Sequence, residues 1–250
     1  MFLAEPPPSQ GDLHFSLLGF PVRINPWFWL TTVVLGLRDP DPVHLLLWVA
    51  AVLLCILLHE LGHALVMRAY GFDAAIVLYS FGGLAIPRPG RRGMRNPGPW
   101  GQILICAAGP ASGFILTGLL VLGLHYLGRY PIHFLEDFRQ GNWLSIVPEV
   151  DNIRNSLLNQ FLKDIFWITI FWGILNLLPI FPLDGGQIAQ QFFSLFHPQE
   201  AVRQSLILSV IVAGMMCYVA FVRVGDMFLG IFFLWLAYSS FSALQSSRVT

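Results

Sequence analysis

Charged residues are scarce in this sequence. Asp, Glu, Lys and Arg together make up 11% of its 250 residues, whereas a soluble domain carries about 25%. With 56% hydrophobic residues, the chain has too few charges to cover a folded surface that faces water. The composition therefore excludes a soluble protein and predicts an integral, multi-pass membrane protein whose solvent is the lipid bilayer.

Three other features are missing. Fourteen basic residues are balanced by fourteen acidic ones, so no basic excess points to a nucleic acid partner. Cys55, Cys106 and Cys217 lie far apart in apolar runs, which argues against a disulfide framework or a cysteine zinc site. The N-terminus lacks the basic flank and long apolar core of a cleavable signal peptide, so we expect internal segments to direct membrane insertion.

Six apolar segments predict membrane spans, because a spanning helix needs about 20 mostly apolar residues. They are residues 24–37, 43–71, 100–128, 162–180, 205–222 and 226–243. Residues 72–90 alternate loosely in hydrophobicity and end in proline and glycine, so they predict a short membrane-associated β-hairpin. The expected fold class is an all-α polytopic membrane protein with about six transmembrane helices and this hairpin.

The chain is expected to form a single domain over residues 1–250, because no internal repeat is visible. An N-terminal tail over residues 1–20 precedes the first predicted span. A polar extramembrane loop over about residues 129–161 separates the third predicted span from the fourth. This loop is interpreted as an exposed connection or, alternatively, as a segment that gates access or binds a partner.

One short loop suggests how the chain is oriented. It contains Arg88, Arg91, Arg92 and Arg95, and the positive-inside rule places such a loop in the cytoplasm. With six spans, both termini would then also be cytoplasmic, in the cell (inner) membrane. Six other basic residues would lie on the outer side in this arrangement, so the bias is weak.

The sequence HELGH, residues 59–63, places strongly polar side chains inside a predicted span. His59 and His63 are four residues apart and share one helix face, so both imidazoles can reach one metal ion. With Glu60 they form the H-E-x-x-H pattern, in which the histidines bind zinc and the glutamate is the general base. Ionisable residues within a span indicate a functional site. The alternative is polar contact between helices without a metal.

A third zinc ligand has to come from elsewhere, because a catalytic zinc takes three protein ligands and keeps one position open. The other histidines lie in or near loops or at the far end of a span. Asp184 is the better candidate, because Pro182 and the glycines after it break the helix and let the carboxylate point inward. Non-helical backbone at membrane depth is tolerated where it lines a cavity. The alternative is that Asp184 caps the following helix.

Two motifs on separate spans together resemble the site-2 protease family of intramembrane zinc metalloproteases. They are HELGH at 59–63 and NLLPIFPLDGG at 176–186, with AAGPASG at 107–113 as a weaker third. The short-loop, six-span layout is most similar to the branch that processes sporulation factors. The resemblance implies a Zn2+ ion bound by His59, His63 and Asp184, with Glu60 as the catalytic base.

The resemblance also suggests roles for residues around the metal. Asn176 would hold the substrate backbone or the developing oxyanion, or else satisfy a carbonyl freed by Pro179. Phe81, Gly82 and Gly83 match a region that pairs with an extended substrate, although both glycines can equally be turn residues.

The motif at 107–113 departs from the family pattern A-G-P-x-x-N. Gly113 stands where that pattern has asparagine. A polar contact near the active site is therefore lost, or Ser112 replaces it. The departure removes neither a predicted metal ligand nor the predicted base.

The expected function is hydrolysis of a peptide bond in or near a transmembrane segment of a single-span or membrane-anchored protein substrate. A regulatory membrane protein is a further partner to consider. The first alternative is a metal-ion transporter, for which broken helices are also typical, although no second H-E-x-x-H-like copy is present. The second alternative is a non-catalytic relative that binds membrane segments, against which the presence of Glu60 speaks.

Overall fold

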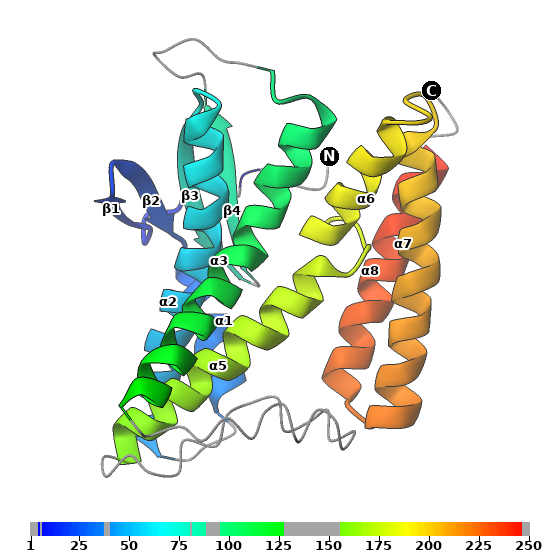
Figure 1. The fold of residues 1–250 in the computed structure, drawn as a ribbon. Helices are drawn as coiled ribbons and strands as arrows, with labels where there is room; N and C mark the ends of the chain where they lie inside the picture. Colours follow the sequence, from blue (N-terminus) through cyan, green and yellow to red (C-terminus); the bar gives the residue numbers. More distant parts are fainter. Residues whose placement is uncertain are drawn as a thin grey trace.

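The structure, a computed structural model, describes residue 5 and residues 7–37, 41–80, 82–88, 96–127 and 156–246. Its long helices form two groups (Figure 1). The first group packs α2, α3 and α5 against one another, and the second is the α7–α8 hairpin. Helix α6 contacts α3 and α7 and so joins the two groups. The helices are α1 (Pro26–Gly36), α2 (Pro42–Ala69), α3 (Gly98–Tyr126), α5 (Ser156–Leu177), α6 (Asp184–Ser194), α7 (Ala201–Tyr218) and α8 (Met227–Ser246).

A four-stranded sheet lies beside α2, in the order β1-β2-β3-β4. The strands are β1 (Leu13–Leu17), β2 (Phe20–Ile24), β3 (Asp73–Tyr79) and β4 (Gly82–Arg88). The outer pairs are antiparallel, whereas β2 and β3 run parallel with Val22 opposite Ile76. The predicted hairpin over 72–90 is therefore present as β3 and β4. The predicted tail over 1–20 misses β1, whose exposed Leu13 and Phe15 give no alternating burial signal.

Local sequence signals explain where the first two helices begin. Asn25 accepts a hydrogen bond from the Trp27 amide, and Asp41 accepts one from the Val43 amide. Each cap is followed by a proline in the first helical position, where no N–H is needed. The Trp48 indole donates to the Thr32 carbonyl and ties α1 to α2.

The prediction of six spans is not confirmed. Among the described residues, four helices are long and apolar enough to cross a bilayer: Pro42–Ala69, Gly98–Tyr126, Ala201–Val224 and Met227–Ser246. The predicted first span corresponds to α1, which has only 11 residues. The predicted fourth span corresponds to α5, which is long enough but begins with polar residues and contains Lys163 and Asp164.

The break that the sequence predicts around Pro182 lies between α5 and α6. Helix α5 ends at Leu177, and α6 begins at Asp184 itself. Helix α5 starts at Ser156, so the last residues of the predicted loop 129–161 are helical. The rest of that loop up to residue 155, and Arg91, Arg92 and Arg95 of the basic loop, lie outside the described residues.

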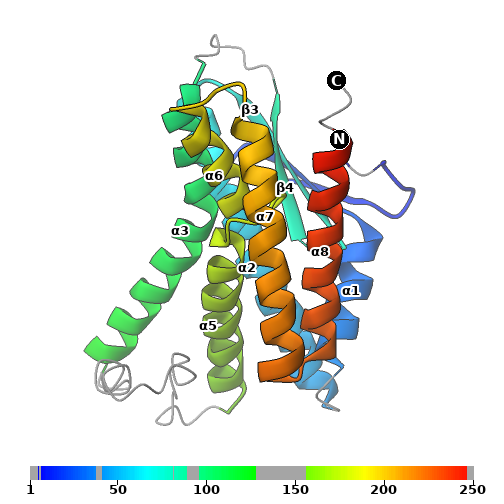
Figure 2. The ribbon, with the colours of Figure 1, turned by 90° about the vertical axis from the view of Figure 1, so that its right-hand side faces the viewer.

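The described ends of the chain lie toward one end of the helix array. In Figures 1 and 2 the sheet flanks the upper half of α2, and α8 runs upward to its last residue. The start of α3, which follows the basic loop, is at this same end. HELGH lies in the C-terminal half of α2, in the part of that helix that the sheet covers.

Candidate metal centre

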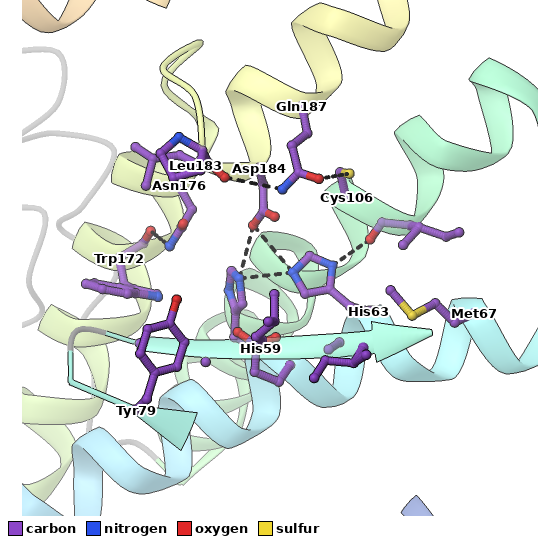
Figure 3. A pocket seen from close by; sticks show the side chains of 18 of the residues that line it. His59, His63, Met67, Tyr79, Cys106, Trp172, Asn176, Leu183, Asp184 and Gln187 are labelled. Carbon is purple, nitrogen blue, oxygen red and sulfur yellow. Dashed lines mark hydrogen bonds and ion pairs between the residues drawn. The ribbon is translucent and has the colours of Figure 1, made fainter. Parts of the chain in front are cut away.

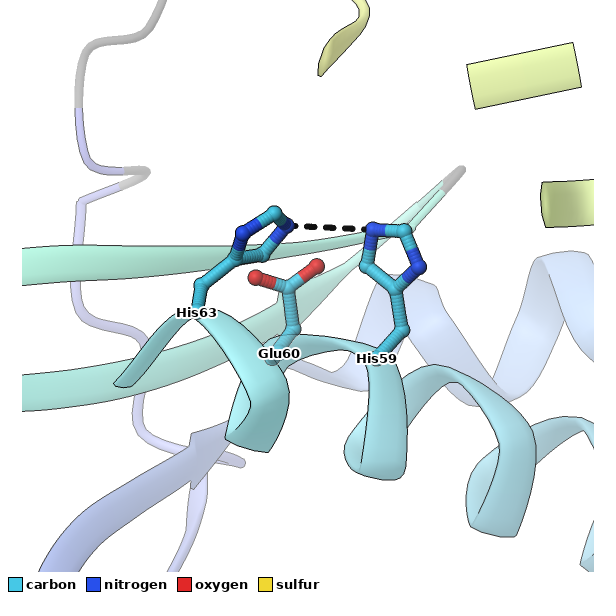
Figure 4. A group of neighbouring side chains, drawn as sticks. All are labelled: His59, Glu60 and His63. Carbon is cyan, nitrogen blue, oxygen red and sulfur yellow. Dashed lines mark hydrogen bonds between the residues drawn. The ribbon is translucent and has the colours of Figure 1, made fainter. Parts of the chain in front are cut away.

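His59 and His63 lie on one face of α2, as their spacing predicts (Figure 4). Their ring centroids are 4.8 Å apart and the rings are nearly perpendicular, at 79°. The two Nε2 atoms are 3.2 Å apart, so both imidazoles present the same nitrogen to one point. Both side chains are buried.

Asp184 reaches the same point from the first turn of α6. Its Oδ2 atom lies 3.1 Å from the His59 Nε2 atom and 3.4 Å from the His63 Nε2 atom. In a tetrahedral site with zinc–ligand bonds of 2.0–2.1 Å, ligand atoms are about 3.3 Å apart. The three measured distances therefore form one face of a zinc-sized tetrahedron, and these residues fit Zn2+.

The surroundings of His63 and Asp184 leave their ligand atoms free to bind a metal. The Nδ1 atom of His63 is 2.6 Å from the Ile105 carbonyl oxygen of α3. Donation from Nδ1–H to that carbonyl leaves Nε2 without a proton, which is the form that binds a metal. Asp184 does not cap α6, because Leu183 is the N-cap residue of that helix and no side chain makes a cap hydrogen bond there. The capping alternative is therefore wrong.

Glu60 rises from α2 between the two histidines (Figure 4). One ligand atom from each of His59, Glu60 and His63 can be chosen so that all lie within 4.8 Å of one another. The Glu60 carboxylate faces β4, where it interacts with the backbone amide of Ala85. This carboxylate is thus beside the metal position and next to the outer edge of the sheet.

Two glycines, Gly109 and Gly83, lie so close to the side chains of the site that a Cβ atom at either position would collide with them. A Cβ atom on Gly109 of α3 would lie 2.2 Å from the His63 Nε2 atom and 2.7 Å from the His59 Nε2 atom. A Cβ atom on Gly83 of β4 would lie 2.3 Å from the Glu60 Cγ atom. Gly109 therefore leaves the metal position open, and Gly83 lets β4 approach the carboxylate. Gly109 belongs to the weaker motif at 107–113, for which the sequence suggests no contact with the histidines.

Asn176 lines the same cavity near the end of α5. Its Nδ2 atom donates to the Trp172 carbonyl, 3.0 Å away. That carbonyl is not the one that Pro179 frees, because the freed Leu175 carbonyl accepts from the Leu178 amide instead. One of the two amide hydrogens remains for another acceptor.

Gly113 does not face the metal centre. A Cβ atom there would meet Thr169 of α5 at 3.6 Å, an ordinary contact. The hydroxyl oxygen of its neighbour Ser112 lies 3.0 Å from the Leu58 carbonyl oxygen and 2.6 Å from the Gly109 carbonyl oxygen, so its one hydrogen is shared between these two acceptors. Ser112 thus binds α3 to α2 one residue before His59 and does not take the place of an asparagine amide in the cavity.

His59, Glu60, His63, Asn176 and Asp184 border a cavity of about 410 Å³ between β4, α2, α3, α5, α6 and α8. Figure 3 shows His59, His63 and Asp184 converging at its centre, with Tyr79 and Trp172 on one side and Met67 and Cys106 on the other. Phe232 and Trp235 of α8 also line it. Most of the wall is therefore apolar, with a few polar groups directed at one point, as in a binding site.

The structure brings together His59, Glu60, His63 and Asp184 and places Asn176, Gly82 and Gly83 in the wall of the same cavity. Phe81, beside those glycines, lies outside the described residues. Sequence reasoning missed Tyr79, Trp172 and Gln187. Gln187 donates to the Pro182 carbonyl at 3.3 Å. Gln187 follows Asp184 by three residues, so the two share one face of a helix, and this spacing is the one sequence signal for Gln187.

The chain is similar in sequence to a known family of peptidases. Residues 47–219 match the model of Peptidase family M50. A candidate zinc metalloprotease of Synechocystis sp. is 29% identical over 192 residues, which are 69% of this chain and 41% of that protein. A zinc metalloprotease of Methanocaldococcus jannaschii is 27% identical over 189 residues, covering 72% of this chain and 44% of that protein. The chain thus spans less than half the length of these two relatives.

The fold has a counterpart among solved structures. The site-2 protease from Methanocaldococcus jannaschii superposes with a TM-score of 0.57 at 21% identity. The alignment covers 93% of this chain and 95% of that one, so the two share the same arrangement of helices and sheet. Because the family model covers well over half of the chain, the chain belongs to Peptidase family M50.

Proposed function

We propose that this protein is a zinc-dependent intramembrane endopeptidase. The observation that carries the proposal is the triangle of His59 Nε2, His63 Nε2 and Asp184 Oδ2, with sides of 3.1, 3.2 and 3.4 Å. Its edges suit one tetrahedral zinc ion and leave the fourth position toward the cavity. Zinc, when bound, would acidify a coordinated water and polarise the carbonyl of the scissile bond.

Glu60 is proposed as the general base. Its carboxylate lies beside the ligand atoms but is not part of the triangle, so it is available to take a proton from a water and return it to the leaving amine. The remaining amide hydrogen of Asn176 is proposed to stabilise the oxygen on which negative charge develops. His63 contributes by presenting Nε2, an orientation supported by its contact with the Ile105 carbonyl.

The proposed substrate is a membrane-anchored protein whose segment binds in extended form along β4. This strand is at the end of the sheet order, and within the described part of the chain no strand pairs with its outer edge. Residues 82–87 line the cavity, and the Ala85 amide already faces Glu60 on that edge. Strand addition would hold an unwound substrate backbone next to the metal, with main-chain hydrogen bonds supplying affinity.

The membrane setting of the proposal rests on the four apolar helices and the family. We propose that α5 is a further span, because it packs against both α2 and α3 and its charged residues, Lys163 and Asp164, are confined to its first half. We also propose the cell membrane, with the sheet end of the molecule and both chain termini in the cytoplasm. This placement requires an even number of crossings, so the short helix α1 would complete a sixth. The sporulation-factor-processing branch remains a proposal from the short loops of the sequence.

Replacing Glu60 with glutamine is expected to abolish cleavage and leave zinc in place, because the amide cannot accept the proton. The rate should fall about 100-fold or more. Wild type and Glu60→Gln are expressed beside a panel of tagged single-span proteins, and the fragments are blotted. Metal content is measured on the same purified proteins.

Full activity of Glu60→Gln would contradict the assignment of the base. Zinc binding without fragments from either protein, over the whole panel, would favour the metal-transport alternative or a non-catalytic relative. Fragments from wild type that disappear with 1,10-phenanthroline and with Glu60→Gln would support the proposal.

Replacing Asp184 with alanine removes one corner of the triangle, so zinc affinity should fall more than the roughly 10- to 100-fold seen on loss of an outer partner. Chelator competition on the detergent-purified protein measures the dissociation constant. Glu200→Ala is the control, because Glu200 is an exposed carboxylate that pairs with Arg203. An unchanged dissociation constant for Asp184→Ala would move the third ligand elsewhere.

Replacing Gly109 with alanine should remove most of the bound zinc, because the new methyl group would occupy the space beside both Nε2 atoms. The matched control is Gly118→Ala in the same helix, where an added Cβ meets nothing within 4 Å. Zinc content per mole of protein is the measurement. Equal zinc in the two variants would place the metal away from these nitrogens.

Replacing Gly83 with alanine should lower turnover and spare the metal. The added Cβ would displace Glu60, whose Oε1 atom would be 2.7 Å away, and a misplacement of about 1 Å can cost about 100-fold in rate. Turnover and zinc content are both measured, again beside Gly118→Ala. Loss of zinc with Gly83→Ala, or unchanged turnover, would argue against Glu60 acting from its observed position.

A further inference from the structure

The peptide groups of Phe181 lie in the break between α5 and α6, three residues before Asp184. Neither helix supplies hydrogen bonds for the Phe181 N–H and C=O groups. At membrane depth no water can replace a missing partner, so an unsatisfied backbone group is strongly destabilising. The break can therefore form only where hydrogen-bond partners for the Phe181 N–H and C=O groups are present.

Both partners are serines of the α7–α8 hairpin. The Phe181 amide donates to the Ser209 Oγ atom of α7 at 2.9 Å. The Ser240 hydroxyl of α8 donates to the Phe181 carbonyl at 3.1 Å. The Ser209 hydroxyl in turn donates to the Ser205 carbonyl at 2.7 Å, so it acts as donor and acceptor at once. Ser209 and Ser240 are both 0% exposed, which excludes water as a competitor.

The connection from Phe181 to Asp184 is short and tightly packed. The Leu183 amide donates to the Ile180 carbonyl at 2.8 Å. Ile180 is buried in a cluster with Ala213 of α7 and Phe233 of α8. A Cβ atom on Gly186 would lie 2.4 Å from the Phe181 nitrogen. A shift of Phe181 would therefore be passed on to the start of α6 and to the Asp184 carboxylate.

The α7–α8 hairpin makes few other packing contacts with the helices that carry the metal centre. Helices α7 and α8 pack on each other, and α7 packs on α6. Among the described elements, neither packs extensively against α2, α3 or α5. The histidines belong to α2, whereas Asp184 is fixed to the hairpin side of the molecule through α6 and the Phe181 peptide groups.

We propose that Ser209 and Ser240 are positioning residues that set Asp184 against His59 and His63, and so make the α7–α8 hairpin part of the metal centre. This inference rests on the proposed function, in which these three residues bind zinc. Neither serine touches the metal position or the substrate. Their effect on the site is transmitted by the backbone of residues 181–184.

The test uses Ser209→Ala and Ser240→Ala in the full-length, detergent-purified protein, with Ser205→Ala as the matched control. Ser205 is 1% exposed in the same helix, and its hydroxyl donates to the Val202 carbonyl within that helix. Chelator competition should give a zinc dissociation constant about tenfold weaker for each of the first two variants, the size of effect seen for outer partners of metal ligands. Ser205→Ala should match wild type.

Cobalt(II) replaces zinc in a second measurement, because its visible absorption reports ligand geometry. The spectrum should change in Ser209→Ala and Ser240→Ala and stay unchanged in Ser205→Ala. A loss of stability alone would leave the spectrum of loaded, monodisperse protein unchanged.

Two results would overturn the inference. The first is that Ser209→Ala and Ser240→Ala both have the zinc affinity and the cobalt spectrum of Ser205→Ala. In that case the two serines would only satisfy the Phe181 peptide groups and would not position Asp184. The second is a wild type that binds no zinc, which would sink the proposed function as well. Because the first result requires a wild type that does bind zinc, the two failures are distinguishable.

Discussion

The structure depends on the convergence of two imidazoles and one carboxylate at a buried point among apolar helices. Polar groups in such a place are costly unless something satisfies them. His59, His63 and Asp184 satisfy one another only in part, since three acceptor-bearing groups meet at 3.1–3.4 Å. A bound cation resolves the conflict, and the ligand spacing suits zinc.

Several features of the backbone make this convergence sterically possible. Helices α2 and α3 approach closely where a Cβ on Gly62 would lie 2.4 Å from the Ala108 carbonyl oxygen. Gly109, the next residue after Ala108 in α3, opens the space that the metal would take. Helix α5 stops early, so that α6 can begin at Asp184. The cost of this break is met by hydroxyls from α7 and α8, which explains two fully buried serines in otherwise apolar helices.

The sequence predicted the chemical core better than the architecture around it. The spacing of the histidines in HELGH is a local signal that places both on one helix face. The proline and glycines around Asp184 are a second local signal, which places Asp184 at a helix break. The four-stranded sheet was not predicted, because it pairs residues 22–24 of β2 in parallel with residues 76–78 of β3, and such pairing between distant segments leaves no local pattern. Six spans were expected from hydropathy alone, but helix length and the charges in α5 reduce the number that qualify to four.

Contacts between distant segments explain the remaining omissions. Nothing near Ser209 or Ser240 in the sequence points to Phe181, and nothing near Gly109 points to the histidines. These roles appear only when the helices are placed side by side. Zinc X-ray absorption of the purified protein tests the central claim most directly. The account predicts nitrogen and oxygen ligands at about 2.0–2.1 Å, with the signature of two imidazoles. A sulfur ligand at about 2.3 Å, for which Cys106 is the nearby source, or a single imidazole would contradict it.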